Sequence, residues 1–197
     1  LGTTATTAQI DPEAFTRALI RSAERRGAEV RRGKVTGIAE KNGAVAAVAI
    51  DGESVPADAV VIAMGPWSIL AAQWLPLPAV FGLKGHSIVF DTAAKVPPEA
   101  LFLEYREASG ATSAPEVFPR PNGTTYVCAI SSESPLPVDP ADVTPDDGAI
   151  ARLRNICRTI SPLLAPAKIL AEQACYRPVT RDGLPLMGRT SELQQQV

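Results

Sequence analysis

The sequence predicts an α+β fold in which short antiparallel strands outnumber helices, and three observations support this. The dipeptides Asn42-Gly43 and Asp51-Gly52, both typical of tight hairpin turns, separate short runs of β-favouring residues. The chain contains 14 Gly and 18 Pro among 197 residues, so turns are frequent. Only two longer segments, residues 12–26 and 150–160, have the apolar spacing of an amphipathic helix.

The first helix is predicted from its end signals. Asp11 is suited to cap the helix, Pro12 to occupy its first position, and Gly27 to end it. The meander that should follow has strands over residues 34–40, 44–50 and 54–57. Residues 58–64, with the sequence DAVVIAM, are continuously apolar after the first residue, which predicts a strand buried on both faces of a parallel sheet. A short helix over 68–74 is expected next.

The region after Pro76 should contain an antiparallel sheet. Its expected strands cover residues 81–90, 101–106, 116–120, 124–130 and 168–177. Residues 131–143, rich in Pro, Ser and Asp, are expected to form a surface loop. Thr144 followed by Asp147 resembles a capping box, which predicts the start of the second helix.

Composition excludes several classes of protein. Hydrophobic residues make up 46% and charged residues 20% of the chain, as in an ordinary soluble globular domain. The net charge of −2 and the lack of a basic run argue against a nucleic acid partner. No apolar run approaches the ~20 residues of a membrane span. The three cysteines, Cys128, Cys157 and Cys175, are widely spaced and odd in number, so we expect a reducing compartment, either cytoplasm or an organellar matrix.

Common catalytic signatures are absent from the sequence. It contains no G-x-G-x-x-G, Walker A, G-x-S-x-G or H-E-x-x-H pattern. His86 is the only histidine, so the chain cannot supply a multi-histidine metal site. This histidine either lines a pocket or, as is more common, is simply hydrogen-bonded in the structure.

Three segments carry residues suited to ligand binding. In residues 60–68, VVIAMGPWS, the expected buried strand ends near Gly65, where a ligand can approach the backbone closely. Residues 116–123, EVFPRPNG, bring a carboxylate and a guanidinium into a hairpin. In residues 175–188, Arg177 is followed by Pro178 and offers a planar fork for a carboxylate. Taken alone, the first two segments are better explained as structural turns, and the third is explained equally well as a turn or as a binding site.

The order and spacing of these motifs resemble the FAD-dependent oxidoreductases of the D-amino-acid oxidase, glycine oxidase and sarcosine oxidase group. The resemblance spans nearly the whole chain, and its most specific element is RPVTRDGLPLMG at residues 177–188. It implies a partial FAD-binding α/β region with a β-meander over residues 1–76. An antiparallel-sheet substrate domain would follow over 77–176, with a return to the FAD-binding region over 177–197.

The resemblance also implies the site and its chemistry. FAD would be the cofactor, a small amine or amino acid the substrate, and hydride transfer to the flavin the reaction. Arg177 would hold the substrate carboxylate and Glu116 would select the substrate. The positions that the resemblance places beside FAD are Val35, near the adenine end, and Ala63, Met64, Gly65, Trp67, Thr180, Asp182 and Gly183.

The sequence departs from the family pattern in two respects. The phosphate-binding G-x-G-x-x-G and the C-terminal Gly-rich segment are missing, so we expect a fragment that is inactive alone and retains FAD weakly or not at all. Ala114 and Glu116 stand where glycine-oxidase-like members carry His or Tyr, and a carboxylate there would favour a cationic amine. The alternative is a non-catalytic assembly or binding protein that keeps the flavoprotein scaffold.

Overall fold

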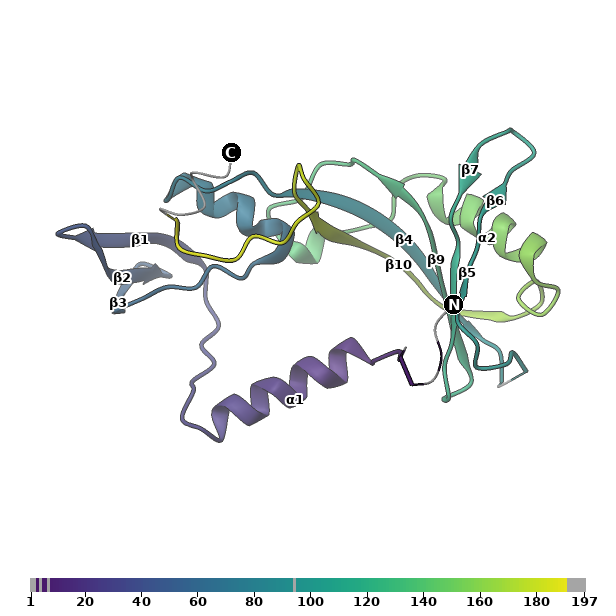
Figure 1. Ribbon diagram of the computed structural model, residues 1–197, viewed down its shortest axis with the longest axis horizontal. Helices are drawn as coiled ribbons and strands as arrows, with labels where there is room; N and C mark the ends of the chain where they lie inside the picture. Colours follow the sequence, from purple (N-terminus) through teal and green to yellow (C-terminus); the bar gives the residue numbers. More distant parts are fainter. Residues whose placement is uncertain (1–2, 4, 7, 94, 191–197) are drawn as a thin grey trace. The chain divides into compact units, whose positions relative to one another are not determined.

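The computed structural model describes residues 3, 5, 6, 8–93 and 95–190 (Figure 1). The chain divides into two compact units, Leu1–Val60 and Val61–Val197. Within the described ranges, no helix has both the length and the apolar character needed to cross a membrane. The assignment of residues 1–76, 77–176 and 177–197 to cofactor-binding and substrate-binding parts stays a prediction.

The first unit begins with helix α1 (Pro12–Glu24), as predicted. The carboxylate of Asp11 accepts a hydrogen bond of 3.0 Å from the backbone N–H of Ala14, so the capping residue satisfies one of the free donors at the helix start. Gly27 follows with a positive φ of 92°. The helix end therefore uses a conformation that glycine adopts without strain.

A three-stranded antiparallel meander completes the first unit and confirms the predicted hairpins. Its strands are β1 (Val35–Lys41), β2 (Ala44–Ile50) and β3 (Glu53–Pro56), in the order β1-β2-β3. Asn42 and Gly43 both have positive φ values, of 54° and 75°, and Asp51 and Gly52 have 51° and 85°. Two successive positive φ angles define the turn whose twist matches that of a hairpin.

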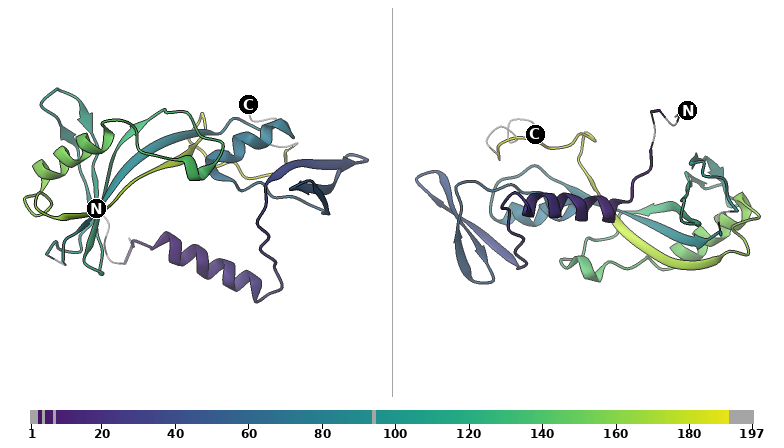
Figure 2. Two further views of the ribbon diagram at one scale, coloured as in Figure 1. Left: turned by 180° about the vertical axis from the view of Figure 1, so that it is seen from behind. Right: turned by 90° about the horizontal axis from the view of Figure 1, so that it is seen from below.

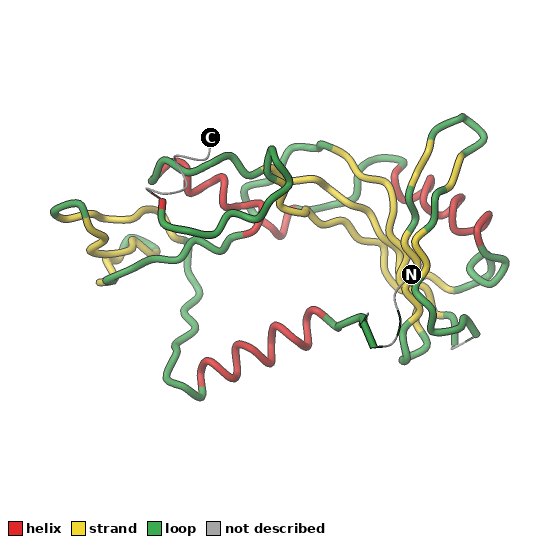
Figure 3. Tube along the Cα trace, in the orientation of Figure 1, coloured by secondary structure: helices red, strands yellow, loops and turns green. Residues whose placement is uncertain are grey.

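The predicted strand over residues 58–64 is wrong. The structure gives this segment no regular strand, and Val61 is 88% exposed (Figure 3). A strand needs a hydrogen-bonded neighbour, and no strand in the described part of the chain pairs with this one. The short helix expected at 68–74 is present as the 3-10 helix η1 (Gly65–Gln73), which begins three residues earlier.

The second unit is built on a five-stranded antiparallel sheet in the order β10-β4-β9-β8-β5. The strands are β4 (Phe81–Asp91), β5 (Leu101–Phe102), β8 (Glu116–Pro119), β9 (Thr124–Ser132) and β10 (Lys168–Val179). A separate two-stranded ribbon pairs β6 (Tyr105–Arg106) with β7 (Thr112–Ser113). The single strand expected over 101–106 is therefore divided between two sheets, and β7 was not predicted.

Helix α2 (Ala149–Ile160) packs against β4 and β9 and covers one face of the sheet (Figures 1 and 2). The core between them consists of Ile88, Phe90, Val117, Val127, Leu153, Cys157 and Leu164. A short 3-10 helix, η2 (Pro140–Asp142), lies in the loop before α2. The 3-10 helix η1 also contacts the sheet, at β10 and β4.

The predicted capping box at Thr144 is wrong, because α2 begins later. Gly148, with a φ of 75°, occupies the capping position. The carboxylate of Asp146 accepts hydrogen bonds from Lys84 and Ser134, each of 2.6 Å, so this part of the chain is tied to the loop and to β4. The left-handed φ of Gly148 is not a helical conformation, so α2 begins after this residue.

Candidate functional site

The register of the sheet places both predicted catalytic residues on the face that α2 does not cover. Glu116 of β8 pairs with Cys128 of β9, which in turn pairs with Ser87 of β4. Directly paired residues point to the same side of an antiparallel sheet, and residues two apart on one strand do so as well. Gly85 therefore shares this face with Ser87.

Arg177 reaches the same face from the edge strand. Cys175 of β10 pairs with Gly85, and Arg177 follows two residues later. The core residue Ile88, by contrast, pairs with Val127 and faces α2. Arg177 and Glu116 thus come from strands on either side of the β9-β4 pair and from the same surface of the sheet.

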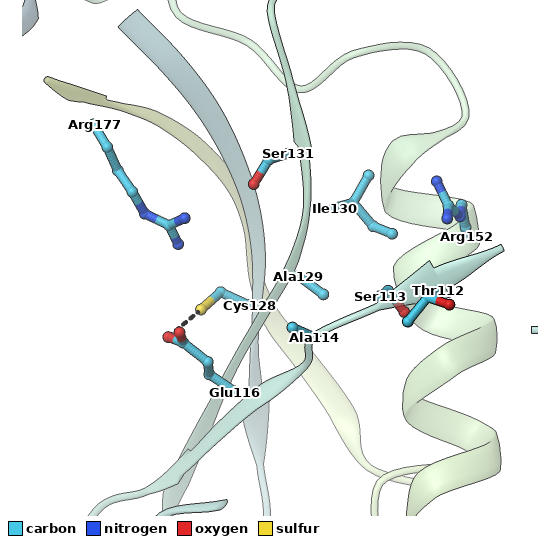
Figure 4. A pocket seen from close by; sticks show the side chains of 10 residues that line it. All are labelled: Thr112, Ser113, Ala114, Glu116, Cys128, Ala129, Ile130, Ser131, Arg152 and Arg177. Atoms are coloured by element: carbon cyan, nitrogen blue, oxygen red, sulfur yellow. Dashed lines mark hydrogen bonds between the residues drawn. The ribbon is translucent and has the colours of Figure 1, made fainter. Parts of the chain in front are cut away.

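These residues converge on one cavity of ≈ 340 Å³ (Figure 4). Its lining residues are Thr112, Ser113, Ala114, Glu116, Cys128, Ala129, Ile130, Ser131, Arg152 and Arg177. The guanidinium of Arg177 points towards Glu116 and Cys128, whereas Arg152 approaches the cavity from α2. The cavity therefore extends from the open face of the sheet past the start of β8.

Glu116 and Cys128 form a hydrogen-bonded pair within this cavity. The Cys128 thiol donates to Oε2 of Glu116 over 3.3 Å. Burial first, and then the adjacent Glu116, raise the pKa of the Cys128 thiol to about 11. The thiol is therefore protonated at neutral pH, and it acts as a donor that orients the carboxylate.

Arg177 is the cation of the cavity that is available to a ligand. It forms no hydrogen bond or ion pair with any residue in the described ranges. Its guanidinium lies over Gly85, where a Cβ atom would stand 3.6 Å from Cζ. Arg152, in contrast, is already paired with Glu107 through hydrogen bonds of 3.0 Å from Nε to both carboxylate oxygens.

A hydroxyl group in the wall of the cavity is also unsatisfied. Among the described residues that are not exposed, Ser113 has the only buried side-chain oxygen or nitrogen without a hydrogen-bond partner. A buried polar atom without a partner costs free energy, and it is commonly satisfied by water or a ligand. The cavity therefore has polar groups that a small polar molecule would satisfy.

His86 is buried on the other face of β4 and does not line this cavity. Its Nε2 accepts a hydrogen bond of 3.0 Å from the backbone N–H of Asp146. Nδ1 therefore carries the proton and donates to the carbonyl of Ile130 over 2.8 Å. Of the two roles considered from the sequence, the hydrogen-bonded one is confirmed. No group of three or more potential metal ligands was found among the described residues.

The predicted cofactor residues of the second unit lie in two segments. Ala63 and Met64 belong to the irregular segment before η1, and Gly65, with a φ of 55°, is the first residue of η1. Trp67, on η1, donates a hydrogen bond of 2.7 Å to the carbonyl of Pro137 and packs edge-on against Tyr176, with ring centres 6.2 Å apart. Trp67 thus ties this segment to the strand that carries Arg177.

The second segment is the turn after β10. Thr180 donates to the carbonyl of Leu184 over 2.8 Å, and Asp182 accepts from the N–H of Leu184 over 3.1 Å. This backbone hydrogen bond is the main cause that holds the pKa of Asp182 below its usual value. Gly183 has a φ of 73°. Val35, the remaining predicted residue, lies at the start of β1 in the first unit.

The sequence reasoning missed Cys128, Ser113 and Ser131. A signal for Cys128 existed, since the turn at Pro121-Asn122-Gly123 sets the register of the hairpin that pairs Glu116 with Cys128. Ser131 gave no such signal, because its position depends on an irregularity in β9.

Comparison with known proteins identifies the family of this chain. A family model described as FAD dependent oxidoreductase, DAO, matches residues 2–195. A Schizosaccharomyces pombe protein is 28% identical over 137 residues, which are 69% of this chain and 35% of that protein. Glycine oxidase of Pseudomonas putida is 29% identical over 157 residues, 79% of this chain and 39% of that enzyme.

The fold is shared with a solved glycine oxidase from Bacillus cereus. The TM-score is 0.75 at 22% identity, with 91% of this chain and 47% of that chain covered. The chain spans less than half the length of these relatives. Because the family model covers nearly the whole sequence, this chain belongs to the DAO family of FAD-dependent oxidoreductases.

Proposed function

We propose that the protein containing this chain oxidises a small amine or amino acid, with FAD as the electron acceptor. The observation that carries the proposal is the convergence of Arg177 and Glu116 on one cavity. In keeping with the matched relatives' greater length, we propose that residues 1–197 are one part of a longer enzyme.

Opposite charges at the cavity match a substrate with opposite charges. A guanidinium is planar and binds a carboxylate through two parallel hydrogen bonds, and Arg177 forms no hydrogen bond or ion pair with any described residue. The carboxylate of Glu116, oriented by Cys128, would attract a cationic nitrogen. An amino acid satisfies both groups, whereas a simple amine satisfies Glu116 alone.

The residues near the turn glycines fit one side of a flavin. A Cβ atom at Gly65 or Gly183 would meet no atom within 4 Å, so both backbones face open space. Glycine backbones that face open space in this way allow a flavin ring to approach closely. We propose that Ala63 to Gly65, Trp67, Thr180, Asp182 and Gly183 border the ring, and that Val35 lies near the adenine. Bound FAD would supply the hydride acceptor for the substrate carbon.

The chain's own residues orient the substrate. Arg177 would fix the carboxylate, and Glu116 would hold the nitrogen. This would position the carbon between them for oxidation to an imine, which water then hydrolyses. Holding a reacting atom in place is a large part of what a protein contributes to such chemistry.

The experiment uses the full-length protein. We expect a bound flavin spectrum that bleaches when a suitable amine or amino acid is added without oxygen. Arg177→Ala should raise the KM for amino acids by roughly 10-fold or more, the loss of one charge-assisted contact. Arg158→Ala, on α2 and outside the cavity, serves as the control. An Arg177→Ala variant with the KM and turnover of the wild type would contradict the assignment.

Glu116 is tested by substrate preference. Glu116→Gln keeps the shape of the side chain and removes its charge, so the preference for cationic amines should fall. An identical preference in Glu116→Gln and the wild type would contradict its role. A full-length protein without bound flavin would instead favour a non-catalytic binding or assembly protein.

A separate test concerns the isolated segment. Residues 1–197 contain no G-x-G-x-x-G to hold the pyrophosphate, so we expect weak or no retention of FAD. Tight, stoichiometric FAD on this segment would refute that expectation.

A further inference from the structure

An extra residue interrupts β9 where it borders the cavity. The pairing of β4 with β9 runs regularly until His86, which pairs with Ala129, and then shifts so that Gly85 pairs with Ser131. Ile130 is the additional residue, which makes this a β-bulge. Bulges are common next to active sites, where they redirect a side chain.

The bulge is strained and is held in place from the core side. Ile130 has a φ of 58°, which is unusual for a β-branched residue and costs free energy. Its carbonyl accepts the hydrogen bond from Nδ1 of His86, a side chain that is 0% exposed. His86 is in turn fixed by the N–H of Asp146. The strained conformation therefore has a specific buried support.

Because of the bulge, Ser131 and Ser132 each lie on the opposite face of the sheet from the one that regular alternation would give them. Strict alternation from Cys128 would place Ile130 and Ser132 on the cavity face and Ser131 on the core face. With the extra residue, Ser131 pairs with Gly85 and lines the cavity, while Ser132 pairs with Lys84 on the core side. The hydroxyl of Ser132 accordingly donates to Asp146.

Ser131 comes to lie next to the guanidinium of Arg177. That group covers Gly85, and Ser131 is the residue directly paired with Gly85 on the neighbouring strand. Figure 4 shows both side chains entering the cavity from the same end. A hydroxyl beside a guanidinium can donate to the same anionic group.

We propose that Ser131 and Arg177 together bind the anionic group of the substrate, and that His86 is the positioning residue that presents Ser131 by holding the bulge at Ile130. The inference rests on the proposed function in that it takes the ligand of the cavity to be a small zwitterion. It adds the hydroxyl of Ser131 as a second hydrogen-bond donor to the substrate's anionic group. It also explains why His86 is buried and hydrogen-bonded at the bulge.

The test measures binding without turnover. α-Aminoisobutyrate has a carboxylate and an ammonium group but no hydrogen on its α carbon, so it can bind without being oxidised there. Its Kd for the full-length protein is measured by isothermal titration calorimetry. Ser131→Ala should raise this Kd about 10-fold, as expected for one hydrogen bond to a charged group. Ser132→Ala, the matched control on the other face, should leave it within about twofold.

The role of His86 is tested by rescue. His86→Ala should raise the Kd to the level of Ser131→Ala, and adding Ser131→Ala to it should cause little further loss, because both changes remove the same contact. His86→Asn retains an N–H near the position of Nδ1 and should restore much of the affinity. If His86→Ala does not fold, the comparison of the two serine variants still decides the role of Ser131.

Several outcomes overturn the inference. These are an unchanged Kd in Ser131→Ala, equal losses in the two serine variants, or no measurable binding by the wild type. Amine-dependent bleaching of the flavin together with an unchanged Kd would leave the proposed function standing and refute this inference. A raised Kd in Ser131→Ala without bleaching by any amine would support this inference and refute the proposed function.

Discussion

Replacement of Asp146 by Asn should destabilise the second unit more than any other single charge change there. The carboxylate accepts hydrogen bonds from Lys84 and Ser134 at 2.6 Å each, and a further one from Ser132. Lys84 is only 7% exposed, so removal of its partner leaves a nearly buried ammonium without a counter-charge. Breaking such a pair costs about 3–5 kcal/mol. Because the Asp146 side chain is 26% exposed, we expect a value near the lower limit, about 3 kcal/mol.

Urea unfolding of the wild type and of Asp146→Asn measures this cost, and three further variants are compared with them. Asp147→Asn changes the exposed neighbouring carboxylate and should alter the free energy of unfolding by less than about 0.5 kcal/mol. In Lys84→Met both the buried charge and its desolvation penalty are removed. The double variant Lys84→Met/Asp146→Asn should therefore be more stable than the sum of the single losses predicts.

The same pair predicts a pH dependence with a definite sign. The hydrogen bond from Lys84, followed by those from Ser132 and Ser134, holds the pKa of Asp146 well below its ordinary value of 3.8. A carboxyl whose pKa is lower in the folded state than in the unfolded state stabilises the fold fully at pH values above its unfolded-state pKa. This stabilisation is lost as the pH falls through the folded-state pKa. The difference between wild type and Asp146→Asn should thus shrink below about pH 4. A difference that stays constant from about pH 7 to about pH 3 would refute the reasoning.

Three further predictions concern packing, reactivity and capping. Leu153→Ala, at a core position that is 0% exposed, should lower the free energy of unfolding by about 3 kcal/mol, and a loss below about 1 kcal/mol would show that the core is not closely packed there. Iodoacetamide at neutral pH should label exposed Cys175 in the folded protein before Cys128 and Cys157. The latter two thiols are buried, and burial raises their pKa values to about 11 and about 12. Mass spectrometry of the digested protein measures the order of labelling, and the opposite order would contradict this prediction. Asp11→Ala should cost α1 about 1 kcal/mol and speed amide exchange in its first turn, and unchanged exchange would argue that the cap is unimportant.

Local chemistry explains what the sequence could predict. The turns at Asn42-Gly43 and Asp51-Gly52 depend on residues that tolerate positive φ, and the α1 cap depends on one carboxylate and a following proline. These preferences act within a few residues, so they can be read without knowledge of the rest of the fold. The same holds for the long strand β4, although its partners could not be assigned.

Features that depend on distant residues were missed or mistaken. The apolar segment 58–64 has the composition of a buried strand, but composition does not supply a neighbour for pairing. Helix α2 begins after Asp146, whose partners lie on β4 and in the loop after β9. The bulge at Ile130 contradicts the local preference of a β-branched residue, and a histidine distant in sequence supports it. Local preference therefore fails where tertiary contacts determine the conformation.

In the candidate site, the register of the sheet brings two oppositely charged residues, distant in sequence, to one cavity. Glu116 and Arg177 lie on β8 and β10, with β9 and β4 between them. Beside the cavity, the inner strands carry the small residues Gly85, Ser87, Cys128 and Ser131 on this face. These leave room for the longer side chains of Glu116 and Arg177 to reach inward. At Gly85 a Cβ atom would already contact the guanidinium at 3.6 Å, so a large side chain there would displace Arg177 without changing any charge. The residues of β4 and β9 therefore determine how far apart the two charges lie, and the residues of β8 and β10 supply the charges themselves. On this basis the length of a zwitterionic substrate should depend on the residues of β4 and β9, and its charge pattern on Glu116 and Arg177.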